Sequence, residues 1–288
     1  MVIRAGVVGH PIAHSLSPRI HNTWFADYDL PGIYEAVDTH PDDFEKTIRK
    51  LMDEGWAGVN VTLPHKQSAY ELADIVNPVA EVQEAANLLI FSDGKIIADN
   101  TDVHGFSECL TPLWNSKKGK EMPPRLIEQI GKKKEMRAVV LGAGGAAGPI
   151  IDNVLFCQET VVINRTKERA EALAERFGRH RVRAGTWDEL GELLPQTDFL
   201  INTTSLGMKG QPELDVDVSL LPDHAEVYDI VYAPLETKLL RDARASGLVA
   251  VGGLRMLVFQ AEPSFKAFTG VFVRKPQDIL RTLEAELS

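Results

Sequence analysis

RAVVLGAGGAAGPIIDNVLF, residues 137–156, indicates the fold class of this chain. An apolar, β-branched run is followed at once by Gly142, Gly144 and Gly145, and a helix-like run comes next. Glycines allow a backbone to turn tightly and to approach a pyrophosphate, whose charge main-chain N–H groups can hold. Because a strand precedes the glycines and a helix follows them, the pattern predicts a dinucleotide-binding βαβ unit.

The next predicted strand indicates which dinucleotide is bound. A unit that binds NAD usually carries an acidic residue about 20 positions on, where it contacts the ribose hydroxyls. Here the strand ends in INRTKER, residues 163–169, which supplies Asn164, Arg165, Thr166 and Arg169. Guanidinium and hydroxyl groups suit a 2′-phosphate, whereas a carboxylate would repel it. The sequence therefore favours NADP over NAD, with a solvated basic turn as the alternative interpretation.

Short apolar runs alternate with helix-like segments before and after the glycine loop. This alternation predicts an α/β fold with two domains, the first built on a mostly parallel sheet. Within the first domain, Asp93 and Gly94 predict a hairpin turn, and Ser17 before Pro18 predicts a capped helix start. Residues 111–136, rich in Lys, Gly and Pro, interrupt the pattern and predict a linker or surface excursion.

The composition disfavours several classes of function. With 288 residues, 44% hydrophobic and 25% charged, the chain is typical of a soluble globular protein. A net charge of -10 disfavours a nucleic-acid surface, and no run of about 20 apolar residues predicts a membrane span. The two cysteines, Cys109 and Cys157, form no CxxC pair and cannot build a disulfide framework, so we expect the protein to be located in a reducing cytoplasm. No His, Cys and Asp residues have metal-ligand spacing, so we expect no metal.

Polar side chains gather where the predicted strands of the first domain end. Strand ends in α/β domains open onto a cleft, so we expect these side chains to face a ligand. Hydroxyls, carboxamides, one lysine and one aspartate suit an uncharged-to-anionic polyol. The residues are Ser15, Ser17, Asn60, Thr62, Lys66, Asn87, Asn100, Thr101 and Asp102.

Lys66 and Asp102 are the candidate proton-transfer pair. An enzyme that oxidises an alcohol with a nicotinamide cofactor needs a base for the hydroxyl proton as the hydride leaves. A lysine, with an ordinary pKa of about 10.4, becomes a useful base when burial disfavours its charged form. A neighbouring carboxylate opposes that shift and mainly orients the amine. Alternatively, Lys66 is an ordinary solvated lysine at the start of a helix.

Nine blocks of the sequence resemble the shikimate dehydrogenase family. They occur in order along almost the whole chain outside the predicted linker, and together they are far more specific than a glycine loop alone. The blocks are GHPIAHSLSP, GVNVTLPHK, AANLLI, DNTDVHGF, LGAGGAA, NRT, INTTSLGM, DIVYAPLET and GLRMLVFQA.

The resemblance implies a substrate domain of residues 1–105 and 254–288, with a Rossmann NADP-binding domain, residues 106–253, inserted between them. It implies reversible, NADPH-dependent reduction of 3-dehydroshikimate to shikimate, with Lys66 transferring the proton and Asp102 as its partner. The expected partner is this small-molecule substrate, with no nucleic acid and no membrane, and the expected assembly is a monomer or a homodimer.

The resemblance also implies a role for each matching residue. Substrate contacts would come from Ser15, Ser17, Asn60, Thr62, Asn87, Asp102, Tyr232 and Gln260. The pyrophosphate would be cradled by Gly142, Ala143, Gly144, Gly145 and Ala146, and the 2′-phosphate by Asn164, Arg165, Thr166 and Arg169. The track from adenine to nicotinamide would be lined by Thr203, Ile230, Gly253 and Met256.

Three residues depart from the family pattern, namely His10, Arg255 and Phe259, and the last two flank Met256. Alternative functions therefore stay open. A quinate or aminoshikimate dehydrogenase, using NADP or NAD, would share the fold. A non-catalytic regulatory protein would have no need of the Lys66–Asp102 pair, and folate dehydrogenases are disfavoured by the serine pair.

Overall fold

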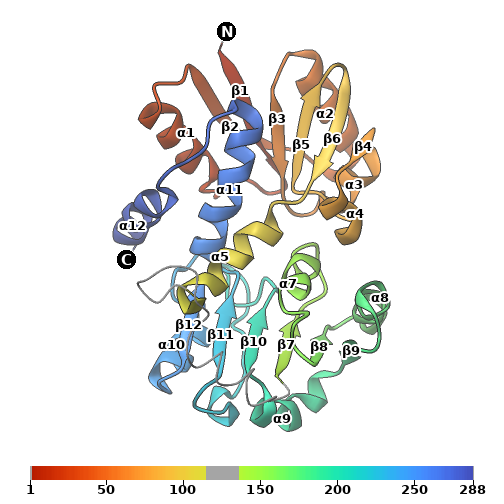
Figure 1. Cartoon of the computed structure of the whole chain (residues 1–288), viewed down its shortest axis with the longest axis vertical. Helices are drawn as coiled ribbons and strands as arrows, with labels where there is room; N and C mark the ends of the chain where they lie inside the picture. Colours follow the sequence, from red (N-terminus) through yellow and green to blue (C-terminus); the bar gives the residue numbers. More distant parts are fainter. Residues whose placement is uncertain (1, 115–135, 288) are drawn as a thin grey trace. The chain divides into compact units, whose positions relative to one another are not determined.

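The computed structural model describes residues 2–114 and 136–287 of the chain. Contacts between these residues divide them into two compact units. The first unit contains the described residues up to Gly105 together with Leu257–Glu286, and the second contains the described residues of Phe106–Met256. The C-terminal helices therefore return to the N-terminal unit, as the blue and red segments of Figure 1 show.

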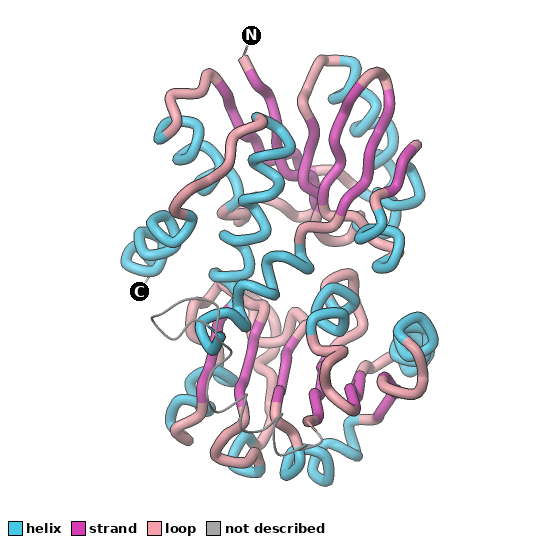
Figure 2. The backbone as a smooth tube through the Cα atoms, in the orientation of Figure 1, coloured by secondary structure: helices cyan, strands magenta, loops and turns pink. Residues whose placement is uncertain are grey.

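The first unit is built on a six-stranded sheet, which Figure 2 shows in magenta. β1 pairs in parallel with β2 and β3, and β4 with β6, whereas β5 runs antiparallel to β3 and β6. The strands are β1 (Ile3–Gly9), β2 (Gly32–Asp38), β3 (Gly58–Val61), β4 (Ile75–Val76), β5 (Leu88–Ser92) and β6 (Lys95–Asp99), in the order β2-β1-β3-β5-β6-β4.

The hairpin that joins β5 and β6 turns at the two predicted residues. Asp93 and Gly94 have φ angles of 51° and 72°, in the left-handed region that a two-residue hairpin turn requires. The predicted hairpin is confirmed, and it supplies the antiparallel part of a sheet that is otherwise parallel.

Helices cover both faces of this sheet (Figure 1). On one face, α2 (Phe44–Asp53), α3 (Lys66–Leu72) and α4 (Pro78–Gln83) pack into one apolar cluster with β1 and β3. On the other, Phe265 of α11 (Gly253–Thr269) lies 5.1 Å from Phe25 of α1 (Ser17–Asp27), measured between ring centroids. The last helix is α12 (Pro276–Leu287).

The second unit contains an all-parallel sheet with helices on both faces. Along β7, Ala138 and Val140 enter one apolar cluster and Val139 and Leu141 the other, as the two-residue period of a strand requires. The strands are β7 (Arg137–Leu141), β8 (Glu159–Ile163), β9 (Val182–Gly185), β10 (Phe199–Asn202), β11 (Glu226–Asp229) and β12 (Val249–Gly252). The helices are α5 (Asp102–Trp114), α7 (Ala147–Asn153), α8 (Lys167–Phe177), α9 (Leu190–Leu193) and α10 (Lys238–Ala245), of which α5 begins in the first unit.

The strand order of this second sheet is β12-β11-β10-β7-β8-β9. Counted from β7 as the first strand, this is the 3-2-1-4-5-6 order of a doubly wound dinucleotide-binding domain. The predicted α/β fold with a Rossmann sheet is therefore confirmed. Across residues 2–114 and 136–287, no helix is both long enough and apolar enough to cross a bilayer.

Two local predictions need correction or restriction. Leu16, rather than Ser17, occupies the N-cap of α1, and the Ser17 main-chain N–H donates to Oγ of Ser15 at 3.3 Å. The excursion predicted for residues 111–136 starts too early, because α5 continues through Trp114 on the helical spacing of Phe106, Cys109 and Leu110. Its residues 115–135 lie outside the described residues.

Candidate active site

The topology of the first sheet brings the predicted polar residues to one edge. Because β1 and β3 are parallel, the segments that follow them, including the one with Lys66, leave the sheet at the same edge. β5 is antiparallel to β3, so Asn87, just before β5, lies opposite the end of β3. β6 ends beside the start of β5 and leads directly into Asp102.

Lys66 is the first residue of α3, and the backbone around it is firmly held. Its carbonyl accepts a hydrogen bond from the N–H of Ala86 at 2.8 Å. The preceding residue, His65, donates from Nε2 to the carbonyl of Thr39 at 2.8 Å and stacks on Phe44. Burial lowers the pKa of His65, which favours its neutral ring. These contacts fix the direction in which the Lys66 side chain leaves the helix.

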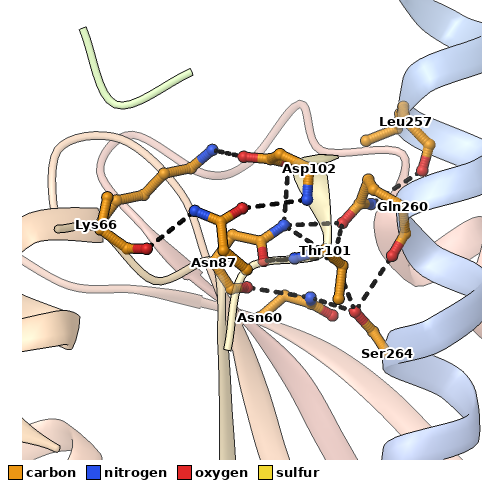
Figure 3. Close-up of polar contacts among 10 residues, drawn as sticks. Asn60, Lys66, Asn87, Thr101, Asp102, Leu257, Gln260 and Ser264 are labelled. Carbon is orange, nitrogen blue, oxygen red and sulfur yellow. Dashed lines mark hydrogen bonds and ion pairs between the residues drawn. The ribbon is translucent and has the colours of Figure 1, made fainter. Parts of the chain in front are cut away.

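Lys66 and Asp102 are in direct contact, as Figure 3 shows. Nζ of Lys66 lies 2.5 Å from Oδ2 of Asp102, and the side chains are 13% and 7% exposed. The other carboxylate oxygen, Oδ1, accepts a hydrogen bond from Nδ2 of Asn87 at 2.9 Å. Hydrogen bonds are electrostatically stronger at such low exposure than in water. Lys66 is therefore not an ordinary solvated lysine.

Gln260 of α11 belongs to the same network (Figure 3). Its Oε1 lies 3.3 Å from both Nδ2 of Asn87 and Oγ1 of Thr101. Its Nε2 donates to the carbonyl of Leu257 at 2.8 Å, which leaves one amide hydrogen for a ligand. The N–H of Thr101 donates to Oδ1 of Asn87 at 2.7 Å. Helix α11 thus reaches the same strand ends as Lys66 and Asp102.

The predicted serine and threonine hydroxyls are less constrained. Ser17 is the first residue of α1, and Thr62 directly follows β3. Among the residues that the structure describes, neither hydroxyl has a hydrogen-bond partner. Ser15 is half-buried, and its Oγ accepts from the Ser17 N–H. These hydroxyls suit the oxygens of a polyol.

Asn60 differs from the other predicted contact residues. Its Nδ2 donates to the carbonyl of Asn87 at 3.1 Å and to Oγ of Ser264 at 2.8 Å, and its Oδ1 accepts from the hydroxyl of Tyr34 at 2.8 Å. Both amide hydrogens are used inside the protein, so Asn60 has no hydrogen left to offer a substrate.

The glycine loop of the second unit follows β7. Gly142 has a φ of 105°, and a Cβ there would lie 2.6 Å from Oγ1 of Thr203, so a larger residue is excluded. Thr203 itself donates to the carbonyl of Leu141 at 2.9 Å. A Cβ at Gly144 would meet nothing within 4 Å. The protein's own packing does not require that glycine, which fits a loop that a ligand approaches.

Asn164 ties the glycine loop to the end of β8. Its Oδ1 accepts from the N–H of Ala143 at 3.2 Å, and its Nδ2 donates to the carbonyl of Thr166 at 2.7 Å. This carboxamide is placed to hold the loop. Arg165 and Arg169 lie exposed just beyond it, and within the described parts of the chain neither guanidinium pairs with a carboxylate. These residues fit a 2′-phosphate.

The remaining predicted cofactor residues follow the carboxyl ends of β11 and β12. Gly253 lies so close to the carbonyl of Ile230 that no Cβ fits, and its N–H donates to the carbonyl of Val231 at 3.1 Å. Met256 is buried in an apolar cluster of the second unit. Tyr232, predicted as a substrate contact, follows the same strand β11, and burial raises its pKa. The ligand contacts of these residues, and of Gly145 and Ala146, stay predictions.

The residues that depart from the family pattern have local contacts. Nδ1 of His10 lies 3.0 Å from Asp38, and Nε of Arg255 donates to the carbonyl of Glu108 at 2.7 Å. Phe259 is buried.

A cavity of about 380 Å³ lies at the amino ends of β7, β8 and β9, the opposite edge of that sheet from the glycine loop. Two of its arginines, Arg137 and Arg183, lie 2.6 and 2.8 Å from the carboxylate of Glu159. Since these charges are already paired, we assign the cavity no role.

Sequence reasoning missed two members of the polar network, Tyr34 and Ser264. Ser264 follows Gln260 by four positions, so helical spacing places both on one face of α11 and could have indicated it. A tyrosine within a strand is normally a core residue, so no pattern marks Tyr34. Thr101 belonged to the predicted polar cluster but was given no role.

Comparison with known proteins agrees with this geometry. The family model described as the shikimate dehydrogenase substrate binding domain matches residues 7–89, and that described as shikimate / quinate 5-dehydrogenase matches residues 125–208. A shikimate dehydrogenase (NADP(+)) of Methylobacterium radiotolerans is 46% identical over 288 residues, 99% of this chain and 98% of its own. The chain belongs to the shikimate dehydrogenase family.

Solved structures of shikimate dehydrogenase relatives share the fold. The shikimate 5-dehydrogenase of Thermus thermophilus, in complex with NADP(H) and shikimate, is 33% identical with a TM-score of 0.82, covering 98% of this chain and 99% of its own. A quinate dehydrogenase of Corynebacterium glutamicum, in complex with NAD, is 26% identical with a TM-score of 0.83, covering 99% of each chain. Fold alone therefore does not separate the two substrates.

Proposed function

We propose that this protein catalyses the reversible, NADPH-dependent reduction of 3-dehydroshikimate to shikimate. The observation that carries the proposal is the buried contact between Lys66 and Asp102, within an array of hydroxyl and carboxamide groups at one sheet edge. The 46% identity to a shikimate dehydrogenase (NADP(+)) over almost the full chain supports the same substrate and cofactor.

Substrate binding would use the polar groups whose hydrogen-bonding capacity is not consumed internally. The hydroxyls of Ser15, Ser17 and Thr62 can each donate or accept, and Gln260 has one free amide hydrogen. Nδ2 of Asn87 already has three acceptors, Oγ1 of Thr101 and Oδ1 of Asp102 at 2.9 Å and Oε1 of Gln260 at 3.3 Å, so Asn87 would contact the substrate by redirecting one amide hydrogen. Because these groups can pair with hydroxyl and carboxylate oxygens, the set suits a polyhydroxylated ring acid.

The proton at the reacting oxygen would be handled by Lys66. In the oxidation direction the Lys66 amine accepts the hydroxyl proton, and in the reduction direction it returns a proton to the carbonyl oxygen. Asp102 accepts hydrogen bonds from Lys66 and Asn87 and so fixes where the amine points. When bound, the nicotinamide cofactor supplies or accepts the hydride.

The cofactor would be held by the glycine loop and by the exposed residues after β8. Gly142, with its positive φ and its contact with Thr203, gives the turn that brings main-chain N–H groups toward a pyrophosphate. Arg165, Thr166 and Arg169 would bind the 2′-phosphate, since β8 ends without a carboxylate to repel it.

A steady-state panel of shikimate and quinate, each with NADP and NAD, tests this function. We expect kcat/KM to be highest for shikimate with NADP, at least about 100-fold above quinate with NAD. The second candidate is a quinate dehydrogenase, favoured by the shared fold of the quinate enzyme. A panel dominated by quinate would replace the proposed substrate, and one without any turnover would reject both enzymes.

A further inference from the structure

The Asn60 carboxamide can adopt only one orientation. The carbonyl oxygen of Asn87 can only accept a hydrogen bond, so it must face the NH₂ group of Asn60. Oδ1 of Asn60 therefore faces Tyr34, whose hydroxyl must donate to it. Tyr34 is 1% exposed, and burial raises the pKa of its phenol well above the ordinary value, which keeps this proton in place.

Ser264 continues these contacts to helix α11. Its Oγ accepts from Nδ2 of Asn60 at 2.8 Å, so its own hydrogen is free to donate. Two acceptors lie within reach, the carbonyl of Gln260 at 3.3 Å and Oγ1 of Thr101 at 3.4 Å. Figure 3 shows these contacts of Ser264. Because Ser264 is fully buried, no solvent can replace these partners. The hydrogen bonds thus run from Tyr34 to Asn60, and from Asn60 both to the carbonyl of Asn87 and to Ser264 of α11.

The side chain and backbone of Tyr34 are held in place by two residues of α1. The ring of His21 stacks on Tyr34 with centroids 4.0 Å apart and planes 3° from parallel. The side chain of Asn22 accepts from the Tyr34 N–H and donates to the Tyr34 carbonyl, each at 2.9 Å. Helix α1 therefore holds both the ring and the backbone of this strand residue.

We propose that Tyr34, Asn60 and Ser264 form a positioning chain that sets the carboxamides of Asn87 and Gln260 for the substrate without touching it. This inference rests on the proposed function, since it assigns how that site is held in shape. Breaking the chain leaves a buried carboxamide oxygen or hydrogen unpaired, which is unfavourable enough that the carboxamide moves to find another partner. A moved Asn60 removes one of the two donors to the Asn87 carbonyl and leaves the N–H of Val61 at 2.8 Å, so the Asn87 carboxamide shifts relative to the substrate.

Tyr34→Phe and Tyr28→Phe form a matched pair for the kinetic test. Each removes one phenolic hydroxyl from the same unit, but the hydroxyl of Tyr28 accepts from the N–H of Arg274, at 2.7 Å, away from the network. We expect Tyr34→Phe to raise KM for shikimate about tenfold and to leave KM for NADP unchanged. Tyr28→Phe should change neither constant. Wild-type KM and kcat in a folded Tyr34→Phe variant would overturn the positioning role.

Coupling between the two ends of the chain gives a second readout. Tyr34→Phe and Ser264→Ala act through the same Asn60 carboxamide, so their combined effect on kcat/KM should be smaller than the product of the single effects. Two effects that simply multiply would show that the residues act separately and would contradict the chain.

Amide hydrogen exchange separates this inference from the proposed function, because it needs no turnover. The Thr101 N–H donates to Oδ1 of Asn87, so it reports whether that carboxamide is held. Tyr34→Phe should speed its exchange at least about tenfold relative to Tyr28→Phe. Equal protection in both variants would reject the positioning chain, whereas a wild-type enzyme inactive on shikimate would reject only the proposed function.

Discussion

Lys66 and Asp102 lie 36 positions apart in the chain, yet their side chains meet at 2.5 Å in a part of the first unit where both are largely buried. Asp102 is held through both carboxylate oxygens, because Oδ2 contacts Lys66 and Oδ1 accepts a hydrogen bond from Asn87. This arrangement suits the carboxylate to orienting the amine, and in the proposed mechanism Lys66 exchanges the proton with the substrate.

Asp102→Asn tests this division of roles. The variant keeps the shape of the side chain but removes the charge that holds the Lys66 amine, so we expect kcat to fall about 100-fold. Steady-state oxidation of shikimate with NADP measures the loss. Asp93→Asn, at the exposed tip of the β5–β6 hairpin, is the matched control and should retain full turnover. A kcat within twofold of wild type for Asp102→Asn would remove this residue from the proton-transfer machinery.

Arg165→Ala should shift cofactor preference. The guanidinium lies exposed beyond β8 and would pair with the 2′-phosphate, which only NADP carries. We expect KM for NADP to rise at least about tenfold, with KM for NAD nearly unchanged. Arg179→Ala, which removes an exposed arginine paired with Glu175, serves as the control. Equal losses for both cofactors would contradict a 2′-phosphate contact.

Asn164→Ala should weaken the binding of both cofactors, in contrast to the NADP-specific effect expected for Arg165→Ala. Its carboxamide holds the N–H of Ala143 and the carbonyl of Thr166, so its loss should disorder the glycine loop that both cofactors share. KM should therefore rise for NADP and for NAD by similar factors. A loss confined to NADP would show that Asn164 contacts the 2′-phosphate directly, as the resemblance implied.

His21 predicts a pH dependence of stability in the first unit. Burial lowers its pKa from 6.5 to about 3, and neither ring nitrogen has a hydrogen-bond partner among the described residues. Between these pH values the unfolded state binds more protons than the folded state, so stability falls as pH falls. The slope is about 1.4 kcal/mol per pH unit.

Urea unfolding of the wild type and His21→Phe at pH 7 and pH 5 measures this contribution. The phenyl ring can keep the aromatic contacts with Tyr34 and Trp24 but cannot bind a proton. The variant should gain about 2 kcal/mol over the wild type on going from pH 7 to pH 5, since the carboxylates common to both proteins cancel. Parallel pH profiles would show that His21 is not held in its neutral form.

Much of the fold followed from local patterns in the sequence. The glycines after β7 and the Asp93–Gly94 turn each satisfy a backbone requirement that few residues meet, so their positions are specific. The sequences of the short strand β9 and of the last strand β12 contain no residue pattern that predicts a strand. Four-residue strands are too short for periodicity to distinguish them from loops, and the neighbouring strands decide their conformation.

The sequence predicted which residues form the candidate site better than it predicted what each side chain contacts. Lys66 and Asp102 could be proposed because the chemistry needs a base and because each follows a strand of the first domain within a polar cluster that contains no other lysine. The resemblance implies that Asn60 contacts the substrate, whereas in the structure its carboxamide is bonded to Tyr34, Asn87 and Ser264. Which way a carboxamide points depends on partners brought from distant segments, and no linear pattern contains that information.

Replacement and chemical restoration of Lys66 test the central claim most directly. Lys66→Cys removes the amine, and alkylation with 2-bromoethylamine rebuilds a side chain of similar length that ends in an amine. The native thiols should stay unmodified, because Cys109 and Cys157 are buried and burial raises the pKa of Cys109 to about 12. Lys50→Cys, at an exposed site on α2, is the matched control and should keep its activity before and after alkylation.

The measurement is kcat for shikimate oxidation with NADP by Lys66→Cys before and after alkylation. We predict a loss of at least about 100-fold, with KM for shikimate changed much less, followed by recovery of a substantial fraction of turnover once the amine is restored. A Lys66→Cys enzyme with near-wild-type turnover, or an alkylated enzyme no faster than the unmodified variant, would contradict proton transfer by Lys66.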